Sequence, residues 1–509
     1  MSDTLPWLSP LRGAEASRET DRHAIEDLHI PSLDLMERAS EGLAALVAEV
    51  APEGVVAVVC GGGNNGGDGY AAARLLRDAW RDVRVLAAVP PEKLGGDARV
   101  QVERLPGDPP RAFTPEGLAG VDVIVDALLG TGFSGEPRGT VGEAIAAVAG
   151  AGIPVVAADV PSGVDASTGE VAGAAVTAVA TATFHASKPG LWINPGKARA
   201  GRVRVVDIGI PARAAARVVA AGEIGLIDDE QLLAPLARRA AGWTKFTSGH
   251  VLVAGGSRGL TGAVVLAGEA AMRAGAGYVS ACVPASQQPV VAAHLVEVMQ
   301  LALAEEDGGH SADGVAAVLE ETGRRGGALV LGPGLGRSDG AQAFARALAA
   351  GAEVPLLLDA DGLNAHAGRL DALARRAAPT VLTPHAGELG RLLGVPAADV
   401  EARRLEHVRE AARASGAIVV LKGDDTLVAR PDGTVAVSPG ATPALATAGT
   451  GDVLSGVAGA MLARGIEPFT AACAAVRLHA RAGVRAAAEV GADGVIARDV
   501  IAALPCARF

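Results

Sequence analysis

The chain has 509 residues and a formal net charge of −12 at pH 7, and half of its residues are hydrophobic although only 3% are aromatic. This length exceeds one ordinary hydrophobic core and predicts two domains, whereas the acidic balance argues against nucleic acid or an anionic membrane as a partner. No stretch is long and apolar enough to span a bilayer, and the four scattered cysteines indicate neither a zinc site nor a disulfide framework, so we expect a cytoplasmic protein.

Short Val- and Ile-rich runs alternate with Ala-, Leu- and Arg-rich segments along the chain, and glycines lie at the junctions. This alternation is typical of βα units, and it predicts an α/β fold class with parallel sheets in both halves. The first such unit is a buried strand over Val55–Cys60, a glycine-rich segment Gly61–Gly69 and a helix over Tyr70–Trp80. Its glycines let backbone N–H groups approach a phosphate, and the amides of Asn64 and Asn65 are suited to orienting or ligating a ligand.

Two carboxylates follow later strands of the same half. Asp126 comes after an expected strand over Val121–Val125, and Asp159 comes after an expected strand over Ile153–Ala158. Because the carboxyl ends of parallel strands meet at the ligand-binding edge of a sheet, Asp126 and Asp159 are a candidate acid/base pair. The alternative is that each Asp only caps a turn, but three marked strand ends together favour the functional interpretation.

A second domain repeats this order of elements. The last N-terminal strand is expected at Arg202–Ile208, and the boundary within Pro211–Asp229, where Ala- and Arg-rich sequence carries no strand signal. Beyond it come a strand over Val251–Ala254, the glycine-rich segment Gly255–Gly262 and a helix over Ala263–Arg273. The glycine spacings of the two halves differ and neither matches G-x-G-x-x-G, so we predict two separate domains rather than an internal repeat.

Polar or glycine-rich loops follow several strands of the second domain. Leu331–Gly336 predicts a rigid turn where the backbone passes close to a ligand. Asp359 and Asp361 are carboxylates suited to placing Mg²⁺. His385 lies at another strand end, where a lone His is more often a structural residue. The lysine, glycine and threonine of Lys422–Thr426 are donors suited to nucleotide phosphates.

The segment Ala448–Gly456 places one carboxylate at a glycine-rich turn that opens a helix. Apolar residues with a period near 3.6 predict a helix that begins close to Thr450 and ends at Gly465, so Asp452 falls in its first turn. There the free N–H groups and the positive end of the helix dipole can hold a phosphate oxyanion. Asp452 itself is placed to take a proton from a hydroxyl that attacks the phosphate. The alternative is an Asp that merely caps a helix.

Five segments of the first half form one recognisable set: Leu35–Ala39, Asn64–Gly69, Asp126–Gly132, Asp159–Gly163 and Phe184–Gly190. From about Asp21 to Pro211 the chain thereby resembles the NAD(P)H-hydrate epimerase domain, which implies a Rossmann-like three-layer domain over 1–215. The resemblance implies potassium ligands at Asn65, Asp126 and Ser162. It implies substrate contacts at Asn64, Asn65, Gly66, Gly67, Asp68, Gly130, Thr131, Gly132, Phe133, Ser134, Gly135, Glu136 and Asp159. We add Lys188 as a further polar group of the pocket, although a Lys beside Pro-Gly is usually only solvated.

The loops of the second half, taken together with Gly255–Ala263, are similar to the ribokinase-like, ADP- or ATP-dependent NAD(P)H-hydrate dehydratases. This resemblance implies a ribokinase-like α/β domain over 224–509 that uses Mg²⁺ with ADP or ATP. It implies that Ala263, Gly334, His385 and Asp452 touch the hydrated nicotinamide nucleotide. It implies that the adenine nucleotide is held by Lys422, Gly423, Asp424, Asp425, Thr426 and Gly451.

Both resemblances together imply a bifunctional repair enzyme for hydrated NADH and NADPH, named NADHX and NADPHX. The first domain would interconvert the R and S forms, and the second would convert the S form to NAD(P)H through a transient phosphorylated intermediate. Asp126, Asp159 and Asp452 are the candidate catalytic residues, and we expect a homo-oligomer. Epimerisation by ring opening and epimerisation by loss and return of water both stay open at this point.

Two other functions are compatible with these motifs. In one alternative, the second domain is an ordinary small-molecule kinase of the ribokinase superfamily, whose phosphorylated product persists. In the other, the first domain is a ligand-binding module without chemistry. Replacement of Asp126 by Ala would abolish epimer exchange only if the first domain is an enzyme.

Overall fold

The computed structural model describes residues 5–211, 222–236 and 242–507. These residues form two compact units: the N-terminal unit comprises residues 10–211, and the C-terminal unit comprises residues 5–9, 222–236 and 242–507. The described residues 5–9 thus belong to the C-terminal unit, although the sequence assigned them to a domain over 1–215. The boundary expected within Pro211–Asp229 falls largely on 212–221, which lie outside the described residues.

The described part of the N-terminal unit contains one seven-stranded sheet, in the order β4-β3-β2-β5-β6-β7-β8, and its paired strands are parallel. Its strands are β2 (Val56–Cys60), β3 (Val83–Ala87), β4 (Arg111–Ala112), β5 (Val123–Ala127), β6 (Val155–Ala158), β7 (Ala180–Phe184) and β8 (Arg202–Val206). Its helices are α1 (Ala14–Arg22), α2 (Ser32–Val50), α3 (Asn64–Asp78), α4 (Gly96–Glu103), α5 (Gly139–Gly150) and α6 (Lys197–Ala200).

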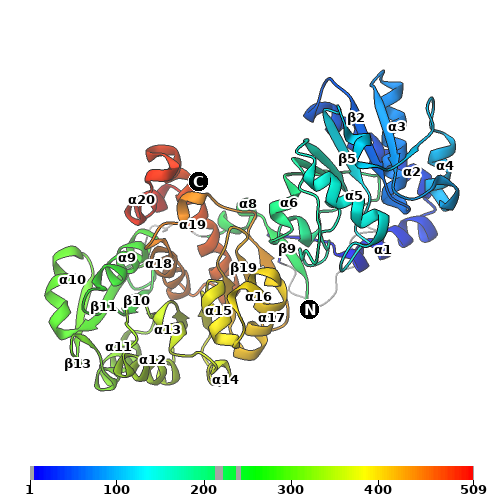
Figure 1. Ribbon diagram of the computed structural model, residues 1–509. Coiled ribbons are helices and arrows are strands. Elements are labelled where there is room, and N and C mark those ends of the chain that lie inside the picture. Colours follow the sequence, from blue (N-terminus) through cyan, green and yellow to red (C-terminus); the bar gives the residue numbers. More distant parts are fainter. Residues whose placement is uncertain (1–4, 212–221, 237–241, 508–509) are drawn as a thin grey trace. The chain divides into compact units, whose positions relative to one another are not determined.

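Helices cover both faces of this sheet (Figure 1). Successive strand residues point to opposite faces, so Val58 of β2 packs with Leu43 of α2 and Tyr70 of α3. Its neighbour Val59 belongs to a separate cluster that contains Ile145 of α5. The expected three-layer α/β arrangement is therefore confirmed.

The described part of the C-terminal unit contains an eleven-stranded sheet, in the order β1-β9-β20-β19-β18-β17-β16-β15-β10-β11-β12, and a separate hairpin of β13 (Glu305–Glu306) and β14 (Gly309–His310). The strands from β18 to β12 are parallel, whereas β19 runs antiparallel to both neighbours. The strands of the large sheet are β1 (Leu8–Pro10), β9 (Ile224–Ile227), β10 (His250–Ala254), β11 (Tyr278–Pro284), β12 (Met299–Leu303), β15 (Ala328–Leu331), β16 (Leu356–Leu358), β17 (Thr380–Leu382), β18 (Ile418–Leu421), β19 (Leu427–Ala429) and β20 (Val435–Val437).

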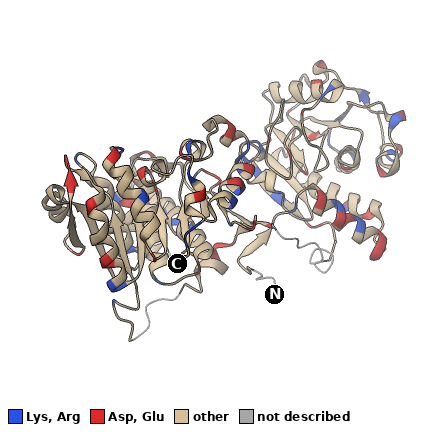
Figure 2. Ribbon diagram, turned by 90° about the horizontal axis from the view of Figure 1, so that it is seen from below, with Lys and Arg blue, Asp and Glu red and all other residues tan. Residues whose placement is uncertain are grey.

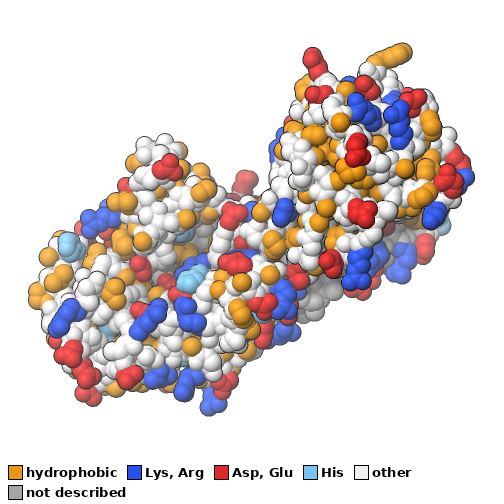
Figure 3. Space-filling model, in the orientation of Figure 1, with side chains coloured by type: hydrophobic (Ala, Val, Ile, Leu, Met, Phe, Trp, Pro, Cys, Tyr) orange, Lys and Arg blue, Asp and Glu red, His pale blue; other side chains and the backbone are white. Residues whose placement is uncertain are grey.

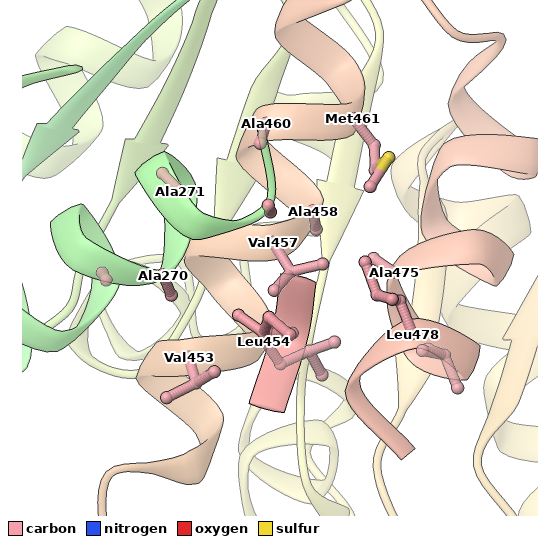
Figure 4. Close-up of a cluster of buried hydrophobic side chains, with 14 of the residues drawn as sticks. Ala270, Ala271, Val453, Leu454, Val457, Ala458, Ala460, Met461, Ala475 and Leu478 are labelled. Atoms are coloured by element: carbon pink, nitrogen blue, oxygen red, sulfur yellow. The ribbon is translucent and has the colours of Figure 1, made fainter. Parts of the chain in front are cut away.

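Small residues let the helices of the C-terminal unit pack closely. The helices are α8 (Asp229–Leu233), α9 (Thr261–Arg273), α10 (Gln288–His294), α11 (Val315–Arg325), α12 (Asp339–Gly351), α13 (Asp361–Asn364), α14 (Leu370–Leu373), α15 (Ala386–Leu393), α16 (Ala397–Ala402), α17 (Arg404–Ser415), α18 (Thr450–Ala463), α19 (Pro468–Val490) and α20 (Ala497–Ala503). Figure 4 shows side chains of α18 together with those of α9 and α19 in one buried cluster. A Cβ at Gly456 of α18 would collide with the backbone of Ala267 in α9, so this close approach depends on glycine.

The start of the chain completes the edge of the large sheet. β1 lies beside β9, and the N–H of Asp228 donates to the carbonyl of Trp7 over 2.9 Å. The buried Trp7 ring lies 5.7 Å from that of Phe469, measured between centroids. Burial of an indole explains why this short segment is fixed to the C-terminal unit.

Acidic and basic residues are interspersed along the helices of each unit (Figure 2). On the face seen in Figure 3, hydrophobic side chains are interspersed with charged ones and with the white atoms of other side chains and the backbone. None of the helices in the described part of the chain combines the length and apolar character that a membrane crossing needs.

Candidate active sites

The glycine-rich segment of the N-terminal unit is helical. α3 begins at Asn64, so the expected helix start at Tyr70 is wrong and Asn64–Gly69 forms the first turns of the helix instead of a loop. A Cβ at Gly66 would collide with the Gly61 carbonyl, and a Cβ at Gly69 would collide with Ala127. These glycines therefore serve the close approach of α3 to the ends of β2 and β5.

Asp126 lies inside β5, where it pairs with Val59 and Ala157, and not after the strand as expected. Its carboxylate is fully buried and accepts hydrogen bonds from the Ser162 hydroxyl at 2.6 Å and N–H at 2.8 Å, and from the Leu128 N–H at 3.3 Å. Burial raises the pKa of Asp126 to about 6, and the bonds from Ser162 and Leu128 oppose that rise. Asp126 thus joins the loops after β5 and β6.

Asn65 carries an amide whose nitrogen and oxygen are both buried without a hydrogen-bond partner in the described part of the chain. A Cβ on Gly130 would lie 3.1 Å from its Oδ1, so the side chain points at the loop that follows β5. Buried amides without partners are rare, which marks Asn65 as a candidate ligand. Ser162, the third residue implied for potassium, is bonded to Asp126.

Asp159 follows β6 in a left-handed backbone conformation, with φ at 65°. The Lys188 ammonium donates to Asp159 Oδ1 at 2.5 Å, and the Thr131 N–H donates to Oδ2 at 3.0 Å with support from the Thr131 hydroxyl. Burial raises the pKa of Asp159, but the Lys188 charge and the hydrogen bonds from Lys188 and Thr131 outweigh it and lower the pKa. Lys188 is therefore buried in the pocket and not solvated at the surface.

The remaining predicted residues of this half differ in their burial. Asp68 is buried in α3, whereas Asn64 and the loop residues Gly132, Ser134, Gly135 and Glu136 are exposed, and Gly130, Thr131 and Phe133 are half-buried. Sequence reasoning missed Asp21 of α1, whose charge acts on Asp68 and whose pKa burial raises to about 6. No local signal marks it, because α1 reaches the pocket only through the fold.

The second candidate site lies at the carboxyl edge of the parallel strands in the C-terminal unit. β16 ends directly before Asp359, and β18 ends directly before Lys422. α18 begins at Thr450, with Gly449 at φ 88°, so Asp452 falls in the first turn. Burial raises the pKa of Asp452 to about 7, the Asp359 charge adds to the rise, and the Lys422 charge opposes it.

Lys422 connects the carboxylates of this site. Its Nζ lies 3.0 Å from Asp359 Oδ1 and 3.8 Å from Glu388 Oε2. Burial lowers the pKa of Lys422, but Asp359, Glu388 and Asp452 outweigh it and raise the pKa, so the ammonium stays charged. A Cβ on Gly451 would lie 3.7 Å from Nζ, which places the charge beside the first turn of α18.

The Asp359 carboxylate is engaged in hydrogen bonds within the protein. Beyond Lys422, its carboxylate accepts hydrogen bonds from the Ser455 hydroxyl at 2.7 Å and the Thr383 hydroxyl at 2.9 Å. Asp361, which the sequence grouped with it, instead pairs with Arg337 at 2.9 Å. The two carboxylates therefore do not form one cluster.

His385 caps α15. The Nδ1 atom of its ring accepts a hydrogen bond from the Gly387 N–H at 3.0 Å, and the backbone N–H of His385 donates to Glu388 Oε2 at 2.9 Å. The side chain is 55% exposed, and its Nε2 lies 3.6 Å from Glu388 Oε1. His385 thus has a structural role, while its exposed ring stays available to a ligand near Lys422.

Ala263 and Gly334 lie against each other. A Cβ on Gly334 would come within 3.1 Å of the Ala263 Cβ and would collide with the Leu260 carbonyl. Gly334 has φ 64°, so both conformation and space favour glycine. The structure thereby brings the turn after β15 to the start of α9.

A buried ion pair between Arg404 and Asp425 holds the loop Lys422–Thr426. Asp425 is buried, and its Oδ2 accepts from Arg404 Nε at 3.0 Å; Arg404 also donates to the Lys422 carbonyl at 3.2 Å. The Thr426 hydroxyl donates to the Gly423 carbonyl at 2.7 Å, and Asp424 is exposed. Asp425 therefore holds the loop, which leaves the exposed positions for a nucleotide.

Sequence reasoning missed Glu388, Ser455 and Arg404 as parts of this site. Ser455 lies one helical turn beyond Gly451, a spacing that would have placed it on the Asp452 side of α18. Arg404 carries no local signal, because it reaches the loop from α17.

Comparison with protein-family models matches residues 251–506 to the NAD(P)H-hydrate dehydratases and residues 32–190 to the YjeF-related protein N-terminus. Among curated proteins, the bifunctional NAD(P)H-hydrate repair enzyme Nnr of Moorella thermoacetica is 37% identical over 505 residues, covering 96% of this chain and 94% of the relative. Nnr of Escherichia coli is 33% identical over 495 residues, covering 96% and 92%. The chain belongs to the bifunctional NAD(P)H-hydrate repair enzymes.

Membership in the bifunctional NAD(P)H-hydrate repair enzymes confirms the family expected from the motifs. Among solved structures, the ADP/ATP-dependent NAD(P)H-hydrate dehydratase from Bacillus subtilis, co-crystallised with ATP and Mg²⁺, is similar to this chain at 31% identity and a TM-score of 0.47, covering 55% of this chain and 95% of that one. The assignments of single residues to substrate, nucleotide and potassium stay predictions.

Proposed function

We propose that this chain repairs NADHX and NADPHX in two steps: the N-terminal unit epimerises the R and S forms, and the C-terminal unit dehydrates the S form with ADP or ATP. Membership in the family supports the pair of activities. The single observation that carries the chemical proposal is the first turn of α18, where half-buried Asp452 lies beside the charged Lys422 and the amides of residues 449–452. The predicted homo-oligomer stays part of this proposal.

The dehydratase chemistry follows from the leaving group. The hydrate carries a hydroxyl at C6 beside N1, and hydroxide leaves poorly. Asp452 takes the proton of this hydroxyl as its oxygen attacks the transferring phosphoryl group, which the amides of residues 449–452 stabilise. The N1 lone pair then expels phosphate from C6, and loss of a proton from the neighbouring carbon restores the dihydropyridine.

Lys422 is placed to attract the nucleotide phosphates, and the exposed part of the loop Lys422–Thr426 offers further donors. The described residues contain no group of three His, Cys, Asp or Glu side chains placed to hold a metal, and Asp359 is already saturated by Lys422, Ser455 and Thr383. Mg²⁺ would therefore be held mainly by the nucleotide phosphates and water, as is usual for this ion. Bound with the nucleotide, Mg²⁺ neutralises phosphate charge.

Potassium fits the loops after β5 and β6. The buried, unpartnered Oδ1 of Asn65 and the Asp126 carboxylate with its Ser162 partner are oxygen ligands of the kind that hard cations prefer. A cation there would stabilise the ionised form of the buried Asp126. It would also fix the loop that carries Thr131 against Asp159.

The dehydration rate should depend on pH through Asp452. A base must be ionised to act, and the pKa of Asp452 is raised to about 7, so we expect kcat to be constant above this pH and to fall roughly tenfold per pH unit below it. Initial rates on the S form at saturating nucleotide from pH 5.5 to 9 measure this profile. A rate that is constant down to pH 5.5 would exclude Asp452 as the base.

Absorbance at 340 nm on a mixture of R- and S-NADHX with Mg²⁺, supplied with ADP or with ATP, tests the proposed function. We expect complete recovery of NADH from both forms with at least one nucleotide, which also reveals the preferred one. Recovery of half of the mixture would contradict the epimerase assignment. A phosphorylated product that persists, with no recovery of NADH, would instead identify a small-molecule kinase.

A further inference from the structure

The Lys188 ammonium is fully used within the protein. It donates to Asp159 Oδ1 at 2.5 Å, to the Thr183 hydroxyl at 2.9 Å and to the Phe184 carbonyl at 2.9 Å. An ammonium carries three protons, so each of them has an acceptor. Lys188 therefore cannot serve as a free proton donor to a ligand, and its geometry is that of a residue that fixes Asp159.

Asp159 is held as a carboxylate in one position. Lys188 fixes Oδ1 and Thr131 fixes Oδ2, while the backbone adopts a left-handed conformation that is uncommon for residues other than glycine. Lys188 and these hydrogen bonds lower the pKa of Asp159 in spite of its burial. Asp159 is thus ionised at neutral pH and is suited to accept a proton.

Asp68 has the opposite environment. Its side chain is buried, and none of the described residues donates a hydrogen bond to its carboxyl group. Burial raises its pKa well above the ordinary value, the charges of Asp159 and Asp21 add to the rise, and Lys188, already engaged with Asp159, opposes it only in part. A buried carboxyl group without a hydrogen-bond donor or a cation of its own favours the protonated form, so Asp68 is suited to donate a proton.

We propose that Asp68 is the proton donor and Asp159 the proton acceptor of the epimerase, with Lys188 as the positioning residue that aligns Asp159. This inference rests on the proposed epimerase function of the N-terminal unit. It replaces Asp126, the partner expected for Asp159 from the sequence, because Asp126 is bonded to Ser162 and Leu128 inside β5. Two carboxyl groups close enough for their charges to interact, one held as a carboxylate by Lys188 and Thr131 and one buried without a donor, are the arrangement that acid/base chemistry needs.

This pair performs the inversion by loss and return of water. Asp68 gives its proton to the C6 hydroxyl, the C6–O bond breaks, and the N1 lone pair forms a C6=N1 double bond as water leaves. Water then adds to the opposite face of C6, Asp159 takes its second proton, and the C6=N1 electron pair returns to N1. No electrons are gained or lost. After the reaction Asp159 carries the proton and Asp68 is ionised, so the two carboxyl groups exchange roles in the reverse direction.

Epimer exchange by the full chain, measured without nucleotide so that the hydrates persist, tests the proposal. One purified epimer of NADHX is incubated in H₂¹⁸O, and both epimers are followed by chromatography and mass spectrometry. We expect the wild-type protein to produce the other epimer with ¹⁸O at C6. Epimerisation with retention of ¹⁶O would overturn the route by water loss, and no exchange at all would overturn the epimerase function together with this inference.

Variants then separate the roles. Asp68→Asn should slow exchange about 10²–10⁴-fold, whereas Asp78→Asn, an exposed acid at the end of the same helix, should leave it unchanged. If Asp68→Asn exchanges the two epimers at the wild-type rate, this inference is overturned while the epimerase function stands.

Lys188→Met should move the acidic limb of the pH–rate profile to higher pH by at least one unit, because Asp159 loses the charge that keeps it ionised. Asp68 and Asp21 are the other titratable groups near Asp159, and both stay in place. Lys188→Arg should retain the wild-type profile. An unchanged profile in Lys188→Met would show that Lys188 has only a structural role.

Discussion

Asp452→Asn is expected to lower dehydration of S-NADHX about 10²–10⁴-fold, the range that loss of a general base typically produces. Asn has the same shape as Asp, so the first turn of α18 and its free amides should be preserved. Nucleotide binding should therefore persist, and nucleotide should still raise the thermal unfolding temperature of the variant. Single-turnover recovery of absorbance at 340 nm measures the loss in the chemical step.

The chain supplies two controls for this experiment. Asp339 also lies in the first turn of a helix, α12, but it is exposed, and Asp339→Asn should retain at least half of the wild-type rate. Epimer exchange by the N-terminal unit of the same Asp452→Asn protein should be normal, which reports on the integrity of the chain. A rate within tenfold of wild type would show that another group accepts the proton.

Local signals explain what the sequence predicted well. The helix after the Gly-Thr-Gly-Asp turn was expected to begin near Thr450, and it does, because a glycine with positive φ and a run of apolar residues with a helical period define its start. The strand ends before Asp159 and Lys422 were predicted for a similar reason: buried strands are continuous apolar runs that stop at a polar residue.

Non-local contacts explain what the sequence could not reveal. Glycines after a strand usually predict a loop, but Gly66 and Gly69 are helical because only glycine permits α3 to touch the loop after β2 and the end of β5. The position of Asp126 inside β5 follows from its pairing with β2 and β6, which a single strand pattern does not specify. Asp21 and Arg404 reach their sites from other elements, so no motif contains them.

The ion pair between Arg404 and Asp425 should contribute strongly to stability. Both side chains are almost completely buried, with exposed fractions of 2% and 1%. Arg404→Met leaves the Asp425 carboxylate buried without its cation, and breaking a buried pair in this way typically costs about 3–5 kcal/mol. Urea unfolding of the C-terminal unit measures the change. The Michaelis constant for the nucleotide should rise as well, because Arg404 also holds the Lys422 carbonyl.

Arg403 supplies the matched control for this effect. It is adjacent in sequence and also paired with an aspartate, Asp399, at 2.6 Å, but its side chain is 40% exposed, so Arg403→Met should cost less than about 1 kcal/mol. Replacing both buried partners, as Arg404→Met with Asp425→Leu, should recover most of the lost stability, because no buried charge is then left alone. Recovery of stability without recovery of nucleotide affinity would show that the buried pair serves to shape the phosphate loop. Equal losses in Arg404→Met and Arg403→Met would contradict the role assigned to burial.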